Sequence, residues 1–421
     1  MNPFIRQLQS KYRVLCFLPL FLCVVSSARA QEVSVLQPRG EKPLSPSQAR
    51  LSAGGYYVPA TEETIRWGYL PNREAKPVIT VPSGSIVTFD TVSHEGILED
   101  QGRDPVKYFG HYGVPPDQVL NDAKAIAGSA LTHDFAKDGP HIVIGPVALE
   151  GAQPDDVLKV EVLSLTPRVP YGVISNRHGK GALPKEFPEN AGPQEGATSS
   201  KPELYNNVST FVPIRRIGGE WYGVLRDGAS NEVRFPIQPF MGTMGIVPAN
   251  AGDRPNSIPP GEYGGNLDIK YLGAGATLYL PIQVPGALFF MADPHFAQGN
   301  GEVALTAVEG SLRTTVRLTV LKAGDQAIPS NGKLTGPFAE TPEYWIPIGL
   351  DPDLNEAMKK ATREAIRFLS EKHHMDRATA LAYLSAATDF EVSQVVDRTK
   401  GIHALIRKRD FVGKATPQKS K

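Results

Sequence analysis

A period-two alternation of apolar and polar residues, broken at intervals by proline and glycine, is the feature that most constrains the fold. The segment 77–96, PVITVPSGSIVTFDTVSHEG, holds two such runs around the turn 82–84. Segments 141–151 and 156–167 form a second pair, and 276–293 forms a third that turns at Pro285-Gly286. Alternation between turn residues is typical of half-buried strands. We therefore expect a mainly β body, a sandwich or barrel of many short strands.

Residues 351–421 change to a helical pattern. Apolar side chains recur at helical spacing in 352–374, and 376–388 continues with Asp376 as a candidate N-cap. Thr-Asp-Phe-Glu at 388–391 has the form of a capping box and predicts a third short helix. His403 lies in the basic stretch beyond, which we expect to be solvated. The chain is then α+β overall, with a helical C-terminal appendage.

The first thirty residues have the pattern of a cleavable secretory signal. Arg6, Lys11 and Arg13 precede an apolar core, and Ala28-Arg29-Ala30 supplies a small-x-small cleavage pattern. The core is short for a membrane span, although an uncleaved anchor is the alternative. We expect a periplasmic or secreted protein made of four parts: a signal peptide 1–30, a flexible mature N-terminus 31–53, a β-rich body 54–350 and the C-terminal segment 351–421.

Removal of the signal changes the composition of the chain. Both cysteines, Cys16 and Cys23, lie within it, so the mature chain has no disulfide and no thiol for catalysis or metal binding. Of the 44 basic residues four lie in the signal, which leaves 40 against 44 acidic residues. A mildly acidic chain without a basic patch predicts no nucleic-acid partner and no membrane contact after cleavage. Homo-oligomer formation stays open.

The stretch ADPHFAQGNGEV, 292–303, concentrates polar side chains directly after an apolar run. Asp293 and His295 are two apart and would share one face of an extended segment. A turn at 299–301 would bring Glu302 beside them, at the start of a returning strand over 302–309. Imidazole and carboxylate suit zinc, and a carboxylate that does not bind the metal can act as general base. An Asp–His hydrogen-bonded pair at a strand end is the alternative.

Other polar residues stand where predicted strands begin or end. Asp90 and His94 would alternate onto one face, and His141 begins a strand. A lone histidine is more often a satisfied core or surface residue, but several at strand ends beside turns predict a shared site. Asn266 and Asp268 are two apart after paired glycines and would face one cavity, or would instead bond their own backbone in a turn.

Segment 171–205 lacks periodicity and is rich in Gly, Pro, Ser and Glu, which predicts a surface excursion or a lid.

The chain has no G-x-S-x-G, no glycine-rich phosphate loop ahead of a helix and no H-E-x-x-H. Several motifs nevertheless follow one another in a specific order: ETIRWGYL, SGSIVTFDTVSHEG, FMGTMGIVPA, then GGNLD, LYLP and DPHFAQGNGE. Together, from about Tyr56 to about Glu309, they resemble the acetamidase/formamidase family.

This resemblance implies a mostly β enzyme that hydrolyses short linear amides to a carboxylate and ammonia, with a divalent metal in its site. Zinc is the ion expected, with calcium or another ion left open. The resemblance and the donor types together give a set of candidate site residues. The expected catalytic residues are Glu302, His295 and Asp293, the substrate-binding residues are Asn266 and Gln298, and the metal ligands are His295, Asp293, His94, His141 and Asp268.

The sequence also departs from the family pattern. Pro294 stands where a glycine is usual, Asn300 where an acid is usual, and Glu95 where a second consecutive histidine is expected. The departures at Pro294 and Asn300 motivate a non-catalytic periplasmic binding or scaffold protein on the same β fold as the alternative. A further alternative is a hydrolase of a bulkier amide or ester, admitted by the excursion 171–205.

Overall fold

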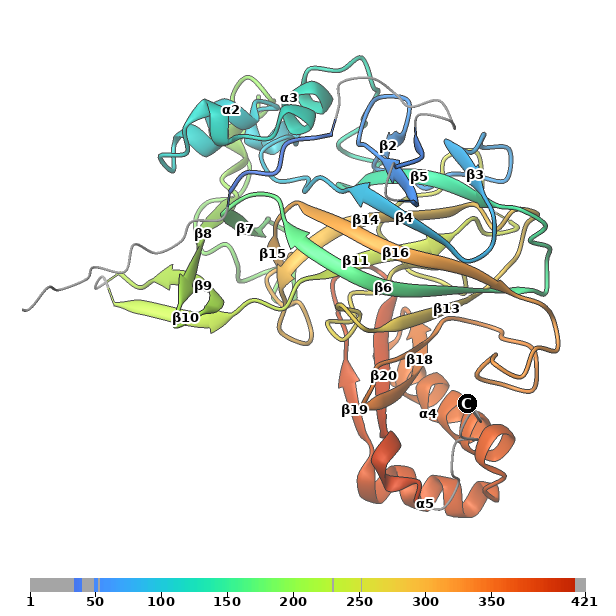
Figure 1. Cartoon of the computed structure of the whole chain (residues 1–421). Helices are drawn as coiled ribbons and strands as arrows, with labels where there is room; N and C mark the ends of the chain where they lie inside the picture. The colour runs from blue at the N-terminus through green and yellow to red at the C-terminus, as the bar shows by residue number, and fades with distance from the viewer. Residues whose placement is uncertain (1–33, 40–48, 52–53, 229–230, 251, 413–421) are drawn as a thin grey trace, which may run out of the picture.

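The computed structural model describes residues 34–39, 49–51, 54–228, 231–250 and 252–412, so the predicted signal and its cysteines lie outside the described residues. The body consists of two large β-sheets that lie one over the other, with helices at its edges (Figure 1). The predicted strand-rich fold is confirmed. Within the described residues no helix is long and apolar enough to cross a membrane.

The first sheet holds nine strands and extends into the C-terminal part of the chain. In spatial order these are β1 (Tyr56–Val58), β4 (Ser85–Asp90), β16 (Leu312–Leu321), β6 (Val157–Pro167), β13 (Thr277–Pro281), β17 (Phe338–Glu340), β18 (Tyr344–Asp351), β20 (Lys400–Arg407) and β19 (Asp389–Val392). The strands from β4 to β20 in this order pair antiparallel with their neighbours.

The second sheet holds eleven strands and carries most of the polar motif. Its main path runs β10 (Glu232–Pro236), β9 (Glu220–Arg226), β8 (Val208–Ile217), β7 (Tyr171–Asn176), β15 (Val308–Glu309), β14 (Phe289–Ala297), β11 (Phe240–Ile246) and β12 (Gly264–Asn266). Off this path, β5 (Ile142–Leu149) pairs with β14, and both β2 (Ile65–Trp67) and β3 (Ile79–Val81) pair with β5.

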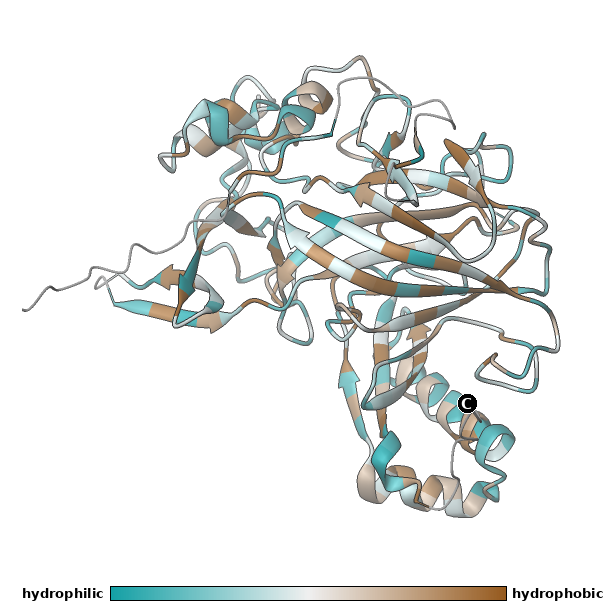
Figure 2. Ribbon diagram, viewed as in Figure 1, coloured by the Kyte–Doolittle hydropathy of each residue, from teal (hydrophilic) through white to brown (hydrophobic). Residues whose placement is uncertain are grey.

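The predicted strands on both sides of all three turns form, but the two strands that each turn joins do not pair with each other as a hairpin. The turn at 82–84 leads from β3 in the second sheet to β4 in the first, and the other two turns likewise link β5 to β6 and β13 to β14. Each turn therefore passes the chain from one layer to the other, and the apolar faces meet between the layers. Phe89 of β4 and Phe289 of β14 pack edge to face there, with ring centroids 6.0 Å apart. Figure 2 shows long apolar stretches along the strands of the body.

Strand β5 differs from the half-buried strand that its sequence pattern predicts, because every residue of Ile142–Leu149 is buried. It lies against β14 on one side, and β2 and β3 lie on the other. His141, immediately before this strand, is buried as well.

The two C-terminal helices are confirmed as α4 (Leu354–His373) and α5 (Arg377–Ala387), with Asp353 and Asp376 as N-caps. The predicted third helix is wrong, since residues 389–392 form β19 against β20. Phe390 and Val392 are two apart, and both pack on the buried face of α4. His403, expected in a solvated tail, is fully buried in β20. Strand pairing therefore prevails over the capping pattern.

The remaining helices are short and lie at the edges of the sheets. They are α2 (Pro105–Gly110), α3 (Asn121–Ala127), η1 (Glu99–Gln101), η2 (Pro116–Gln118), η3 (Pro202–Tyr205) and η4 (Lys408–Asp410). The irregular excursion predicted over 171–205 is shorter than expected, because 171–176 forms the paired strand β7. At the N-terminus, Leu36 is bonded to the body through its backbone N–H, which donates to Arg168 O at 2.8 Å.

Candidate active site

Strand β14 carries the centre of the polar motif through the interior. Asp293 has a positive φ of 58°, a conformation that Asp tolerates better than most residues. Its carboxylate lies beside the next motif residue on the same strand: Oδ2 is 3.1 Å from Nε2 of His295. Both side chains are buried. The structure therefore brings Asp293 and His295 together as their spacing predicts, although the backbone between them is not regular β.

The returning strand predicted over 302–309 is wrong, because only Val308–Glu309 forms β15. Residues 302–307 instead make an irregular loop that begins at Glu302, whose φ is 48°. Glu302 still approaches the site, with Oε1 4.0 Å from His295 Nε2. Glu309, which sequence reasoning missed, lies closer, with Oε1 3.0 Å from the same nitrogen. In the ladder, Glu309 stands directly opposite His295.

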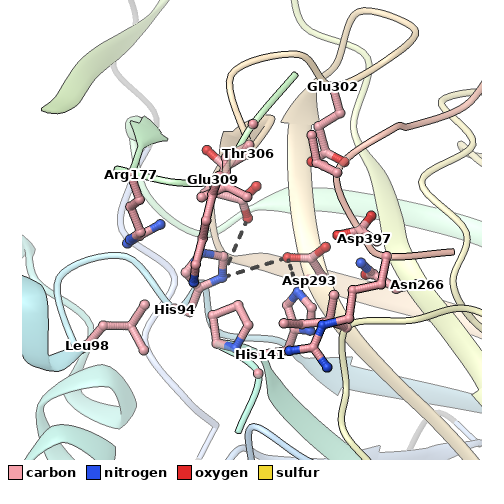
Figure 3. Close-up of a pocket in the computed structure, with 18 of the residues that line it drawn as sticks. His94, Leu98, His141, Arg177, Asn266, Asp293, Glu302, Thr306, Glu309 and Asp397 are labelled. Carbon is pink, nitrogen blue, oxygen red and sulfur yellow. Dashed lines mark ion pairs between the residues drawn. The ribbon is translucent and has the colours of Figure 1, made fainter. Parts of the chain in front are cut away.

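His94 and His141 complete a cluster around Asp293 (Figure 3). His94 Nδ1 is 3.8 Å and His141 Nε2 is 3.6 Å from Asp293 Oδ1, and the two rings meet edge to face. His94 Nδ1 is also 3.9 Å from Glu309 Oε2. Burial lowers the pKa of His141 to about 4, so this imidazole is neutral. Segments far apart in sequence thus supply the side chains of a single cluster.

The expectation that Asp90 shares a face with His94 is wrong. Strand β4 ends at Asp90, whose carboxylate pairs with Arg313 at 2.6 Å on the other side of the sheet. Gly96 has a φ of 85° and turns the chain, so that Glu95 Oε1 comes within 3.2 Å of His94 Nε2. Arg177, another residue that sequence reasoning missed, lies 3.3 Å from the same carboxylate oxygen.

A second group of carboxylates lies beside this cluster. Ligand oxygens of Asp268, Glu302 and Asp397 lie within 4.8 Å of one another, and all three residues are buried. Burial and the neighbouring charges raise the pKa of Asp268 and of Glu302 well above its usual value. Burial also raises the pKa of Asp397 to about 7, with the charge of Asp293 adding to the effect. Asp397 comes from the C-terminal segment and was not predicted.

Asn266 lies at the end of β12 and lines the cavity, as expected. Its side-chain oxygen accepts a hydrogen bond from the hydroxyl of Thr243 on the paired strand β11. Neither side-chain oxygen of Asp268 has a hydrogen-bond partner, so the alternative of a self-bonded turn does not hold for Asp268. Both residues therefore face the interior of the site.

Gln298 lies behind His295 and is absent from the cavity wall. Its amide nitrogen donates to Asp268 O at 2.9 Å and to Ser393 O at 3.1 Å, which turns its oxygen toward His295 Nδ1 at 3.1 Å. This network places a hydrogen of His295 on Nδ1 and turns Nε2 toward Asp293 and Glu309. Gln298 is therefore a positioning residue for the imidazole.

The resemblance found in the sequence implies a metal-dependent enzyme with His295 as a ligand. On that expectation Gln298→Met should lower metal affinity and kcat by about 10- to 100-fold, the usual effect of removing a group that orients a metal-binding histidine. KM should change little, because Gln298 does not contact the cavity. Competition with a chelating dye measures the affinity. Gln283→Met, at a glutamine whose side chain accepts a bond from Ala249 N away from the site, is the matched control. Wild-type affinity in Gln298→Met would remove this role.

The site opens into a cavity of about 380 Å³. Figure 3 shows His94, His141 and Asp293 at one end of it, with Glu302 and Asp397 across from them. The carboxylates exceed the nearby cations, and Arg177 is already paired with Glu95 and Asp100. The charges of Glu309 and Asp293 outweigh burial and raise the pKa of His295 well above its usual value. Such an excess of buried negative charge is stabilised by a bound cation.

Several buried polar atoms in the site have no hydrogen-bond partner, and their chemistry indicates which kind of ligand would fit the site. They include His94 Nδ1, both side-chain oxygens of Asp268, Asp293 Oδ1 and Glu309 Oε2. Each such atom costs about 1–3 kcal/mol unless something satisfies it. Ligand atoms of His94, Asp293 and Glu309 lie within 4.8 Å of one another, as do those of His295, Glu302 and Glu309. This donor set fits a divalent metal ion.

Fold and site together define a β-sandwich protein with a buried cluster of imidazoles and carboxylates that could hold a cation at the end of a cavity. Residues 249–406 match the model of the acetamidase/formamidase family. The resemblance to this family found in the sequence motifs is confirmed.

Individual relatives agree with this assignment. A Schizosaccharomyces pombe protein described as a candidate formamidase is 30% identical over 232 residues, an alignment that covers 47% of this chain and 56% of that protein. A formamidase from Methylophilus methylotrophus is 24% identical over 305 residues, covering 61% of this chain and 73% of the relative. The crystal structure of an acetamidase from Bacillus halodurans is 26% identical, with a TM-score of 0.61, and the match covers 84% of this chain and 98% of that one. The chain thus spans little more than half the length of the first relative.

Proposed function

We propose that the protein hydrolyses small linear amides to a carboxylate and ammonia. The observation that carries this proposal is the convergence of His94, His141 and His295 with buried carboxylates at the end of a cavity. Relatives named formamidase and acetamidase support the reaction class. The predicted signal makes export to the periplasm or the medium part of the proposal.

A divalent metal would be held by His94, His295, Asp293 and Glu309, with His141 and Asp268 next to this set. When bound, such an ion polarises a carbonyl oxygen and lowers the pKa of a bound water. The mixture of imidazole nitrogens and carboxylate oxygens favours zinc, and calcium is the less favoured ion because it prefers oxygen ligands alone.

The residues of the chain divide the remaining work. Glu302 lines the cavity, and its raised pKa matches a group that takes a proton from water and passes it to the leaving nitrogen. Asn266 is the polar group of the cavity wall that would hold the amide of the substrate. The buried surroundings exclude bulk water, which strengthens each of these interactions.

The departures from the family pattern do not favour the binding or scaffold alternative. Pro294 is accommodated within β14, opposite Met241, where its carbonyl accepts from Gly310 N at 3.0 Å. Asn300 donates to Glu391 of the C-terminal segment. Neither residue lines the cavity. Their effects are therefore on packing around the site and leave its chemical groups in place.

Ammonia release from formamide, acetamide and propionamide tests the proposal. We expect the zinc-loaded protein to release ammonia and chelated protein to lose at least about 100-fold in rate, because the ion supplies several kcal/mol of transition-state stabilisation. Re-addition of zinc should restore the rate. A metal-loaded, folded preparation that releases no ammonia from these amides or from any longer one would favour the binding or scaffold alternative.

A further inference from the structure

The cavity is larger than a short amide needs. Its volume is about 380 Å³, within the range of about 300–1,000 Å³ typical of pockets for larger ligands. Acetamide has four non-hydrogen atoms and, at about 30 Å³ for each water-sized group, would fill roughly a third of it. The remaining space is part of the same cavity, so the substrate that fits it best has a longer body than acetamide.

Part of the cavity wall is apolar. Leu98, Phe135, Pro184, Ile258, Leu305 and Val396 line it. These side chains come from separate parts of the chain, and Leu98 is packed in the core of the β body. A methylene chain contacts such a wall favourably, at about 0.8 kcal/mol for each buried CH₂. A substrate with an aliphatic body therefore suits this cavity.

The rim of the cavity carries cations without partners. Lys180 and Arg398 both line the cavity and are exposed, and within the described ranges neither makes a hydrogen bond or an ion pair through its side chain. Desolvation and the neighbouring charges of Arg177 and Arg398 lower the pKa of Lys180. Both cations line the same cavity, and a bound anion there would offset their positive charge.

The other charged groups at the rim are already neutralised. Asp138 is bound by Arg254 at 2.6 Å. Arg177 is bound by Asp100 at 2.6 Å and by Glu95 at 3.3 Å. His133 has both ring nitrogens within 3.1 Å of acceptors, Glu99 and Gly139 O. The charge left to meet a substrate at this rim is that of Lys180 and Arg398.

The backbone around Lys180 is tied to the site loop. Ala182 N donates to Val303 O at 2.9 Å, and Asn176 Nδ2 donates to Ala304 O at 2.7 Å. The segment that carries Lys180 is thus held next to the loop that carries Glu302. These hydrogen bonds hold the backbone near Lys180 in place at the rim of the cavity.

We propose that the preferred substrate is the monoamide of a short dicarboxylic acid, bound with its amide at the imidazole and carboxylate end and its free carboxylate between Lys180 and Arg398. The inference rests on the proposed function and names its substrate class. Water adds to the amide carbon, the C–N bond breaks, and the nitrogen leaves as ammonia after taking a proton. The products are a dicarboxylate and ammonium.

Matched substrates and variants test this assignment. Glutaramate and valeramide share an amide and a similar chain length, and they differ in the terminal carboxylate. We expect kcat/KM for glutaramate to exceed that for valeramide by roughly 25-fold, since each exposed ion pair contributes up to about fivefold. Lys180→Met and Arg398→Met should each remove roughly fivefold through KM, and the double variant should remove the preference. Valeramide hydrolysis should stay unchanged, and Lys185→Met, on the same exposed segment, is the control.

A binding measurement separates this inference from the proposed function. Calorimetric titration with glutaramate should show binding to the wild type and loss of binding in the double variant, whether or not turnover occurs. Binding of glutaramate without hydrolysis of any amide would contradict the proposed function but would support an anion-binding site at Lys180 and Arg398. Equal kcat/KM for valeramide and glutaramate, or a preference that survives in the double variant, would overturn the inference.

Discussion

Asp293→Asn is expected to abolish metal retention and to lower kcat/KM for amides by roughly 10³-fold or more, the effect of losing several kcal/mol of metal-derived stabilisation. The carboxylate of Asp293 lies within 3.1 Å of His295 Nε2 and within 3.6–3.8 Å of His141 and His94. The pKa of Asp293 is held below its usual value, because these imidazoles outweigh the effect of burial. Asparagine removes the charge at the centre of the cluster.

The substitution leaves the backbone intact, because asparagine accepts the positive φ of 58° that Asp293 has. Metal content and ammonia release are measured on the same preparation. Asp155→Asn is the matched control: Asp155 also has a positive φ, of 73°, and it pairs with Lys333 at the surface. Metal bound at the wild-type level in Asp293→Asn, with full activity, would remove Asp293 from the site.

Glu302→Gln is expected to lower kcat by about 10²- to 10⁴-fold, the contribution of a positioned general acid or base. Metal retention should persist, since Glu302 is not one of the residues proposed to hold the ion, which include His94, Asp293 and Glu309. KM should change little. The melting temperature should stay the same or rise, because the raised pKa of Glu302 shows that burial and Asp397 disfavour its charged form.

This combination separates catalysis from structure. A structural role would lower the melting temperature and kcat together, whereas the proposed role lowers kcat alone. Glu150→Gln, at an exposed glutamate after β5, controls for the change of residue type. A Glu302→Gln variant with wild-type kcat would assign proton transfer to another group, and Asp397, with its pKa near 7, is the next acid on the cavity wall.

The strands could be predicted because their alternation and turn residues are local signals. What the alternation does not encode is the sheet to which each strand belongs. The turn at 82–84 joins β3 to β4, yet β3 pairs with β5, and β4 pairs with β1 and β16. These partners are chosen by apolar burial between layers, which depends on distant parts of the chain. The capping pattern at 388–391 failed for the same reason, since pairing with β20 decides its structure.

Some residues of the candidate site could likewise be predicted from local signals in the sequence, and others could not. His94 follows β4 and His141 precedes β5, beside turn residues that the sequence shows, whereas Asp293 and His295 lie within β14 and were marked by their spacing of two. Glu309 ends a run of small and apolar residues, and only the ladder of β14 and β15 places it opposite His295. Nothing local distinguishes it from any exposed glutamate.

The C-terminal segment contributes more to the candidate site than its helical sequence pattern predicted. It was expected as a helical appendage, but its loop 393–399 closes one side of the site. Ser393 O accepts from Gly301 N at 3.0 Å, and Gly301 O in turn accepts from Val395 N at 3.2 Å. Through these bonds the segment holds the loop that carries Glu302, and it adds Asp397 to the cavity wall. The protein therefore needs its last strands for a complete site.

The central claim is that these imidazoles and carboxylates enclose one catalytic cation. Elemental analysis of protein purified without added metal, combined with the ammonia assay on the same sample, tests it most directly. We predict a divalent metal in stoichiometric amount, removed by chelator in step with activity. Full hydrolytic activity in a preparation that contains no divalent metal would contradict this account.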